Sequence, residues 1–473
     1  MCLLMASERR EEKGERCKSC LWLLALVRSP GDYSRYPPFP GSSMDAPALQ
    51  AAVDAAMPLG QALFDDVRAK TAVEAGVSRE PYTAGEQAAV DRVVQAGREL
   101  DLDVKTDPFG NTYLTLAGAD RSAPAWLVGS HVDSVPSGGN YDGYAGVVAG
   151  MTALAAFRHA GVKPACDVTV MAIRAEELSS WYGGHHGGHI GSRAALGQLP
   201  QSELDTAIHS GTGRTLRDHM REAGFDPEAV VPGKSLLDPA RFRGYLELHI
   251  EQGPVLEQRG VPVGVVTAIR GAARSRSCRC VGAYTHSGAV PHEYRSDAVM
   301  ATVGLIHELD SEWTRVRASG GDLVFTVGKL YTDARQHALT KVPGEASFGI
   351  DMRSQDESTL ERMAALTQAL AARIGKERRV QFELSPFSIQ KPAAMDEAFR
   401  SRLAEGCKAL GIAAMEIPSG AGHDAQDFAH AGFRSAMIFV RNEHGSHNPD
   451  EHMEMADFAL GTRLLAWMLL EEG

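Results

Sequence analysis

Residues 126–146, WLVGSHVDSVPSGGNYDGYAG, decide the fold. The apolar run at residues 126–128 predicts a buried strand of a parallel sheet, and the Gly-rich loop after it leads into an amphipathic helix. The loop places His131, Asp133 and Asp142 at the carboxyl end of the strand, where open α/β sheets bind ligands. Such groups suit zinc, manganese, cobalt or nickel, and Asp133 is expected to accept the second ring N–H of His131. A polar surface loop with an incidental histidine is the alternative interpretation.

The next strand should bring a pair of glutamates to the same edge. We expect a helix over residues 146–159 and a buried strand over residues 167–174, followed by Glu176 and Glu177. A strand, helix and strand joined in this way lie with their strands parallel, so the carboxyl ends meet. Adjacent glutamates point in different directions, so one can bind a metal while its neighbour acts as a base.

Two further histidines belong to predicted strands of the same kind. His249 lies in a strand over residues 245–250, and His447 follows a strand over residues 435–440. A single histidine in a strand is more often a core residue than a ligand, so the assignment of His249 depends on the wider pattern.

A segment rich in glycine and histidine follows the glutamates and contains His185, His186 and His189. Such a loop can bind metal adventitiously or line a pocket. We favour the pocket interpretation.

The start of the chain differs from the rest. Residues 21–27 are apolar but too short to span a bilayer, and the mixed charges before them make a poor signal peptide. We expect residues 1–43 to be a disordered extension and Met44 to be a candidate start of translation. A later helix should begin with a capping box formed by Thr83 and Glu86.

From about residue 270 the pattern changes to β-α-β-β-α-β, which is the ferredoxin-like split motif. An insert with its own complete pattern is typical of a second domain. We therefore predict an α/β fold in which residues 44–268 and 389–473 form a mixed-sheet domain and residues 269–388 form a smaller α+β domain. The last strand of the insert is expected over residues 379–387.

Composition excludes several classes of protein. With 473 residues, of which 44% are hydrophobic, the chain can build more than one core. Its 60 acidic residues exceed its 48 basic ones, and the net charge of −12 argues against a general nucleic-acid or membrane surface. The seven scattered cysteines are not a disulfide framework and indicate a reducing, cytoplasmic compartment.

Taken together, the motifs resemble the M20 metallopeptidase and amidohydrolase clan, and within it the hydantoinase/carbamoylase amidases. The similarity covers nearly everything from about residue 50 to the end. It rests on the stretch at 126–146, the glutamate pair and the ordered motifs LELHIEQGPVLE, HSGAVP with RSDA, VPGEASFGIDMRS, GAGHDAQDFA and GSHNPDE. The resemblance implies a zinc-peptidase-like catalytic domain and a lid or dimerisation domain, in a homodimer.

The resemblance also implies a binuclear metal site. Asp142 would bridge two divalent ions, with zinc or manganese expected in preference to cobalt or nickel. His131 and His249 would hold one ion, and Glu177 and His447 the other.

Further residues receive catalytic or substrate roles from the same resemblance. Glu176 would be the general base, with Asp133 as a second catalytic residue, and His286 would stabilise the oxyanion in the partner subunit's site. Arg353 would grip a substrate carboxylate, although a surface ion pair is its alternative role, and Gln252 would contact the substrate.

The chain also departs from the family pattern. Where the family usually has Glu-Glu-Gly-Ser-Arg-Phe, residues 176–181 read Glu-Glu-Leu-Ser-Ser-Trp. The lid motif is altered at residues 286–291, and Thr340 replaces an asparagine that contacts substrate. These changes surround the pocket and not the metals, so they affect the choice of substrate.

The expected function is hydrolysis of N-carbamoyl amino acids or related small amides that carry a carboxylate. An aminoacylase or dipeptidase is the nearest alternative. A catalytically silent metal-binding protein is the alternative from another class, and the presence of Glu176 argues against it, because passive binding needs no base.

Overall fold

Residues 126–146 begin with an inner strand of the largest sheet, in a computed structural model that describes residues 44–183 and 187–470. Strand β3 (Ala125–His131), helix α4 (Tyr144–Ala160) and strand β4 (Val168–Ile173) follow one another. The two strands are parallel neighbours, which confirms the predicted unit. The predictions for residues 1–43, His185 and His186 lie outside the described residues.

The large sheet that contains these strands is mixed, as predicted. Its strands pair in the order β1-β2-β4-β3-β7-β18-β8-β16, and β17 pairs with β8. The inner strands β4, β3, β7 and β18 are parallel, whereas β1, β2, β8 and β16 add antiparallel pairs. The other strands are β1 (Asp103–Thr106), β2 (Thr112–Leu116), β7 (Phe242–Ile250), β8 (Val263–Ile269), β16 (Ala393–Ala394), β17 (Ala414–Ser419) and β18 (Ser435–Val440).

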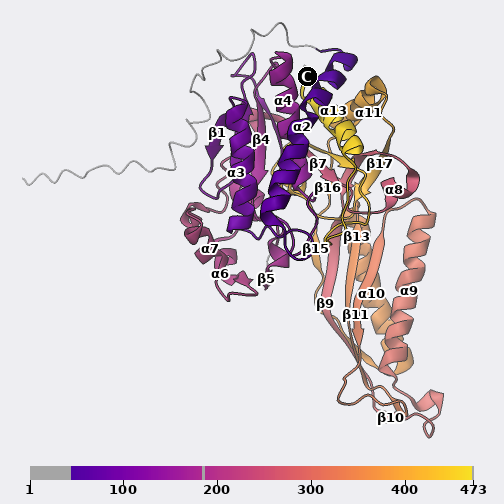
Figure 1. The fold of residues 1–473 in the computed structure, drawn as a ribbon. Helices are drawn as coiled ribbons and strands as arrows, with labels where there is room; N and C mark the ends of the chain where they lie inside the picture. The colour runs from indigo at the N-terminus through magenta and orange to yellow at the C-terminus, as the bar shows by residue number, and fades with distance from the viewer. Residues whose placement is uncertain (1–43, 184–186, 471–473) are drawn as a thin grey trace, which may run out of the picture.

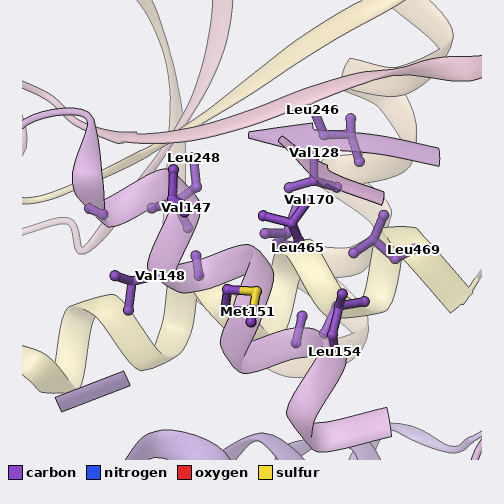
Figure 2. Close-up of a cluster of buried hydrophobic side chains, with 14 of the residues drawn as sticks. Val128, Val147, Val148, Met151, Leu154, Val170, Leu246, Leu248, Leu465 and Leu469 are labelled. Carbon is purple, nitrogen blue, oxygen red and sulfur yellow. The ribbon is translucent and has the colours of Figure 1, made fainter. Parts of the chain in front are cut away.

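Helices cover both faces of the large sheet. Successive residues of a strand point to opposite faces, and the side chains on both faces are apolar. Figure 2 shows side chains of α4 and α13 against those of the strands, with Met151 and Leu154 of α4 and Leu465 of α13 close to Val128 and Val170. This face is covered by α2 (Ala46–Thr71), α3 (Ala84–Glu99), α4, α11 (Glu397–Leu410) and α13 (Met455–Leu470), and α12 (Asp424–His430) packs on the other.

Short elements surround the carboxyl edge of the sheet and share a small core of their own. They are β5 (Tyr182–Gly183), α5 (Ile190–Ala195), α6 (Gln201–Thr206) and α7 (Leu216–Glu222). Strand β6 (Ile208–His209) pairs with β5, and α8 (Val255–Arg259) follows β7. Within residues 44–183 and 187–470, none of the helices combines the length and apolar character that crossing a bilayer requires.

A separate, small sheet extends from the large one, at the lower right of Figure 1. Its order is β11-β13-β9-β14, with β15 also paired to β9, and helices α9 and α10 share its own hydrophobic core. A two-stranded ribbon of β10 and β12 lies at its far end. The bounds are β9 (Gly271–Val281), β10 (Thr285–His286), α9 (Ala298–Ala318), β11 (Val324–Tyr331), β12 (Lys341–Val342), β13 (Glu345–Ser354), α10 (Glu357–Arg378), β14 (Gln381–Glu383) and β15 (Ser388–Gln390).

The strand predicted over residues 379–387 is wrong in its extent. Arg379 ends α10 in the left-handed conformation, at φ +53°, and the strand is divided into β14 and β15. Pro386 lies in the interruption and lacks the N–H that a continuous ladder needs. The Ser385 carbonyl instead accepts a hydrogen bond from the Ser275 hydroxyl at 2.6 Å.

Candidate metal centre

Asp142 is fixed by contacts from the last part of the chain. Glu451 Oε1 accepts the backbone N–H groups of Tyr141 at 2.9 Å and Asp142 at 3.2 Å. Gly143 has a φ of +65°, and a Cβ on it would overlap the ring of His131. The loop can therefore close over that ring only with glycine at this position.

Two histidines face one oxygen of Asp142. The Nε2 atoms of His131 and His249 lie 3.6 and 3.1 Å from Asp142 Oδ1. Their Nδ1 atoms lie 3.2 and 2.8 Å from the backbone carbonyl oxygens of Asp133 and Ile250. Because Nδ1–H donates to the backbone in each neutral ring, the Nε2 lone pair is directed toward the carboxylate.

Asp133 makes a contact that the sequence did not predict. The ring of His131 is closer to its carbonyl oxygen than to its carboxylate, whose Oδ1 lies at 3.4 Å from Nδ1. The carboxylate accepts the backbone N–H groups of Glu176 at 3.1 Å and Glu177 at 2.9 Å. Asp133 therefore holds the glutamate pair in place.

The turn before the glutamates depends on a buried ion pair. Ala175 has a φ of +57°, and its N–H donates to Glu86 Oε1 at 2.9 Å. Arg174 pairs with the same glutamate, and both side chains are buried. Glu86 also accepts the N–H of Tyr82 at 2.8 Å, so the predicted capping box is wrong, although Thr83 does cap α3.

His447 brings a second set of ligand-type atoms to Asp142. Its Nε2 lies 2.7 Å from Glu177 Oε1 and 3.3 Å from Asp142 Oδ2. The candidate ligand atoms of His131, Asp142 and His249 lie within 4.8 Å of one another, and so do those of Asp142, Glu177 and His447. Both groups offer mixed nitrogen and oxygen donors, and they share Asp142.

The charges of these groups fit divalent cations. Asp142 Oδ1 is buried and has no hydrogen-bond donor. Burial lowers the pKa of His131, but Glu176, Asp133 and Asp142 raise it well above its ordinary value. Burial, together with Glu176 and Asp142, raises the pKa of Glu177 to about 7. A bound cation would offset the clustered negative charge and would take the place of the protons that these raised pKa values favour.

A cavity of about 1030 Å³ lies beside these groups, between the two sheets. Metal-ligand candidates and Glu176 line it from the large sheet. The small sheet contributes Arg274, Arg276 and Arg353. The cavity therefore combines a site for metal chemistry with a cationic wall that suits an anionic substrate group.

Two of the predicted substrate contacts line this cavity. Arg353 Nε donates to Asp351 at 2.8 Å, and Nη1 donates to the Gly420 carbonyl at 2.6 Å. Arg353 therefore lines the cavity and also forms an ion pair, so both of its alternative environments occur together. Gln252 Nε2 donates to Asp142 Oδ2 at 2.8 Å. Its amide therefore contacts the candidate metal-bridging residue.

The other two predicted contacts, His286 and Thr340, lie at the far end of the small sheet (Figure 1). His286 belongs to β10 and Thr340 directly precedes β12, and both residues are exposed. The Ser287 N–H donates to the Thr340 carbonyl at 3.0 Å, which holds the two segments together. Within one described chain, neither His286 nor Thr340 lines the cavity beside Glu176.

Besides Glu451, sequence reasoning missed Ser446 and the contacts of His189. The Ser446 hydroxyl lies 2.5 Å from Asp142 Oδ2 and 2.6 Å from Glu451 Oε2, within the motif GSHNPDE, whose polar residues were the available signal. His189, expected only to line a pocket, lies 3.0 Å from Glu176 and 2.5 Å from Asp427.

Comparison with known proteins gives a consistent result. The model of peptidase family M20/M25/M40 matches residues 127–471. The chain is 33% identical to N-carbamoyl-L-amino acid amidohydrolase of Geobacillus stearothermophilus, over 84% of this chain and 94% of that protein. It is 31% identical to allantoate amidohydrolase of Escherichia coli, over 78% of this chain and 86% of that protein. A hydantoinase/carbamoylase family amidase from Burkholderia multivorans has a similar structure, with a TM-score of 0.77, 27% identity and coverage of 87% of this chain and 97% of that chain.

Proposed function

The chain belongs to peptidase family M20/M25/M40, and on this premise we propose that it hydrolyses a C–N bond of an N-carbamoyl amino acid or a related small ureide. The observation that carries the proposal is the position of Asp142, which belongs to two groups of ligand-type side chains beside the cavity that Glu176 lines. Relatives named as N-carbamoyl-L-amino acid and allantoate amidohydrolases support the choice of bond.

In this proposal two divalent ions would be held by Asp142 together with His131, His249, Glu177 and His447. Zinc or manganese is expected in preference to cobalt or nickel. Bound ions of this kind lower the pKa of water and polarise a carbonyl group. Glu176 takes a proton from the attacking water on Oε2, because its Oε1 faces His189 at 3.0 Å. Glu176 then gives that proton to the leaving nitrogen, and Arg353 binds the substrate carboxylate with the guanidinium N–H groups that Asp351 and the Gly420 carbonyl do not accept.

We propose that residues 269–388 form a ferredoxin-like lid on a catalytic domain made of residues 44–268 and 389–473, in a cytoplasmic homodimer. The separate core of the small sheet supports this division. The far ribbon supports the dimer, since His286 and Thr340 are exposed there, away from the cavity of their own chain. Both residues are then available to a partner subunit's site.

The test is release of ammonia from N-carbamoyl-L-amino acids, N-carbamoyl-β-alanine and allantoate, with protein loaded separately with manganese, zinc, cobalt and nickel. N-acetyl amino acids serve as the matched amides without a ureido group. We expect turnover of at least one ureide. Release of acetate without ammonia would favour an aminoacylase, and no turnover by metal-loaded protein would refute the proposed reaction.

A further inference from the structure

We propose that His189, held by Asp427, is a positioning residue that orients the carboxylate of Glu176 toward the attacking water. The inference rests on the proposed function, in which Glu176 is the base. It concerns a histidine of the glycine- and histidine-rich segment that follows the glutamate pair.

The contacts form a continuous row. His189 Nε2 lies 3.0 Å from Glu176 Oε1, and its Nδ1 lies 2.5 Å from Asp427 Oδ2. The three side chains come from the turn after β4, the residue before α5 and helix α12, and all of them line the cavity. Residues distant in the sequence thus meet at the proposed base.

The backbone reinforces this arrangement. The N–H of His189 donates to the carbonyl of Glu176 at 2.9 Å. A Cβ on Gly188 would lie 2.5 Å from the same carbonyl oxygen, so glycine lets the two segments approach this closely. The ring and the main chain of one residue therefore fix both the side chain and the backbone of Glu176.

The row leaves one oxygen of Glu176 for chemistry. A carboxylate at a strand end can rotate, and its proton transfer is efficient only within hydrogen-bond reach of the water. Asp427 fixes the ring of His189, so that Nε2 is directed at Oε1 and Oε2 remains available. The role is orientation of the base, since none of the groups suited to hold a metal among the described residues includes His189.

The test uses His189→Gly, because His189 has a φ of +59° that glycine adopts without strain. We expect kcat to fall by roughly 10- to 100-fold, the size typical of lost orienting partners, with KM and metal content nearly unchanged. Added imidazole should restore part of kcat by occupying the vacated space. His430→Ala, on an exposed histidine of α12, is the matched control and should behave as wild type.

A second variant tests the link to Asp427. Asp427→Ala should lower kcat, and combining it with His189→Gly should cause little further loss, because both act through one contact. Independent, multiplicative losses would contradict the row of contacts.

The outcomes separate this inference from the proposed function. An unchanged kcat in His189→Gly, a loss of metal, or a folded variant that imidazole does not rescue would each overturn the positioning role. A wild-type protein that turns over no ureide would instead refute the proposed function. The ring ¹⁵N shifts of His189 would then still test the contact, because they should move in Glu176→Gln whether or not the protein has turnover.

Discussion

The carboxyl edge of the large sheet and the exposed face of the small sheet hold their functional residues in opposite ways. At the large sheet, Asp142 and Glu176 are buried, and backbone or side-chain contacts fix them from several segments. At the small sheet, Arg274 and Arg353 are half-buried and share the single carboxylate of Asp351. The difference teaches that the proposed catalytic groups are buried and held by contacts from several segments, whereas the arginines proposed to bind substrate are half-buried.

The largest loss of activity should come from a substitution at the buried edge of the large sheet. Glu176→Gln removes the proposed base but keeps its size, so kcat should fall by about 10²- to 10⁴-fold while metal content is retained. Steady-state rates and metal analysis check this. Glu383→Gln, on the exposed small sheet, should leave both unchanged. A Glu176→Gln enzyme as active as wild type would remove Glu176 from its role.

The next effect tests whether the far ribbon serves another subunit. His286→Ala should lower kcat by roughly 10²- to 10³-fold, the cost of losing an oxyanion donor. Mixing inactive His286→Ala and Glu176→Gln proteins under conditions that exchange subunits should restore activity, because one site of each mixed dimer has both residues. Mixtures that stay inactive despite exchange would show that His286 does not act across subunits.

A smaller change in kinetics is expected from a substitution among the arginines that the small sheet contributes to the cavity. Arg353→Lys keeps the charge but loses the planar pair of donors, so KM should rise by about 10-fold with kcat little changed. Arg279→Lys, on an exposed part of the same sheet, is the control. A fall in kcat with KM unchanged would contradict a role limited to binding.

The smallest effect comes from crowding His189. A Cβ at Gly422 would lie 3.1 Å from Nε2 of His189, whereas a Cβ at Gly420 would have its nearest neighbour at 3.7 Å. Gly422→Ala should therefore reduce kcat severalfold, and Gly420→Ala should have little effect. Equal rates in the two variants would show that the ring has room to move.

The sequence predicted the residues around Asp142 because each follows or belongs to a recognisable strand. His131, Glu177, His249 and His447 are associated with β3, β4, β7 and β18, and parallel strands bring such residues to one edge. The contacts of His189 could not be predicted in this way, because its pairing with Asp427 depends on how α5 and α12 pack, and no local pattern records that packing.

Some details required the register of the sheet. Asp133 was expected to accept a ring N–H of His131, and its carbonyl oxygen lies 3.2 Å from Nδ1, while the alignment of β3 with β4 carries its carboxylate to the backbone of Glu176 and Glu177. In contrast, the sequence did contain a signal for the break between β14 and β15, because Pro386 cannot donate a hydrogen bond to a neighbouring strand.

The position of strand β18 has a consequence for folding during synthesis on the ribosome. It lies between β7 and β8, although the whole small sheet separates it from them along the chain. A ribosome therefore releases β7 and β8 long before their shared neighbour, and the growing chain carries unpaired strand edges that invite aggregation until β18 has been made. Since His447 follows β18, a chain that stops before residue 435 has neither a closed sheet nor a full set of candidate ligands. We therefore expect hydrolytic activity only after the ribosome has passed His447.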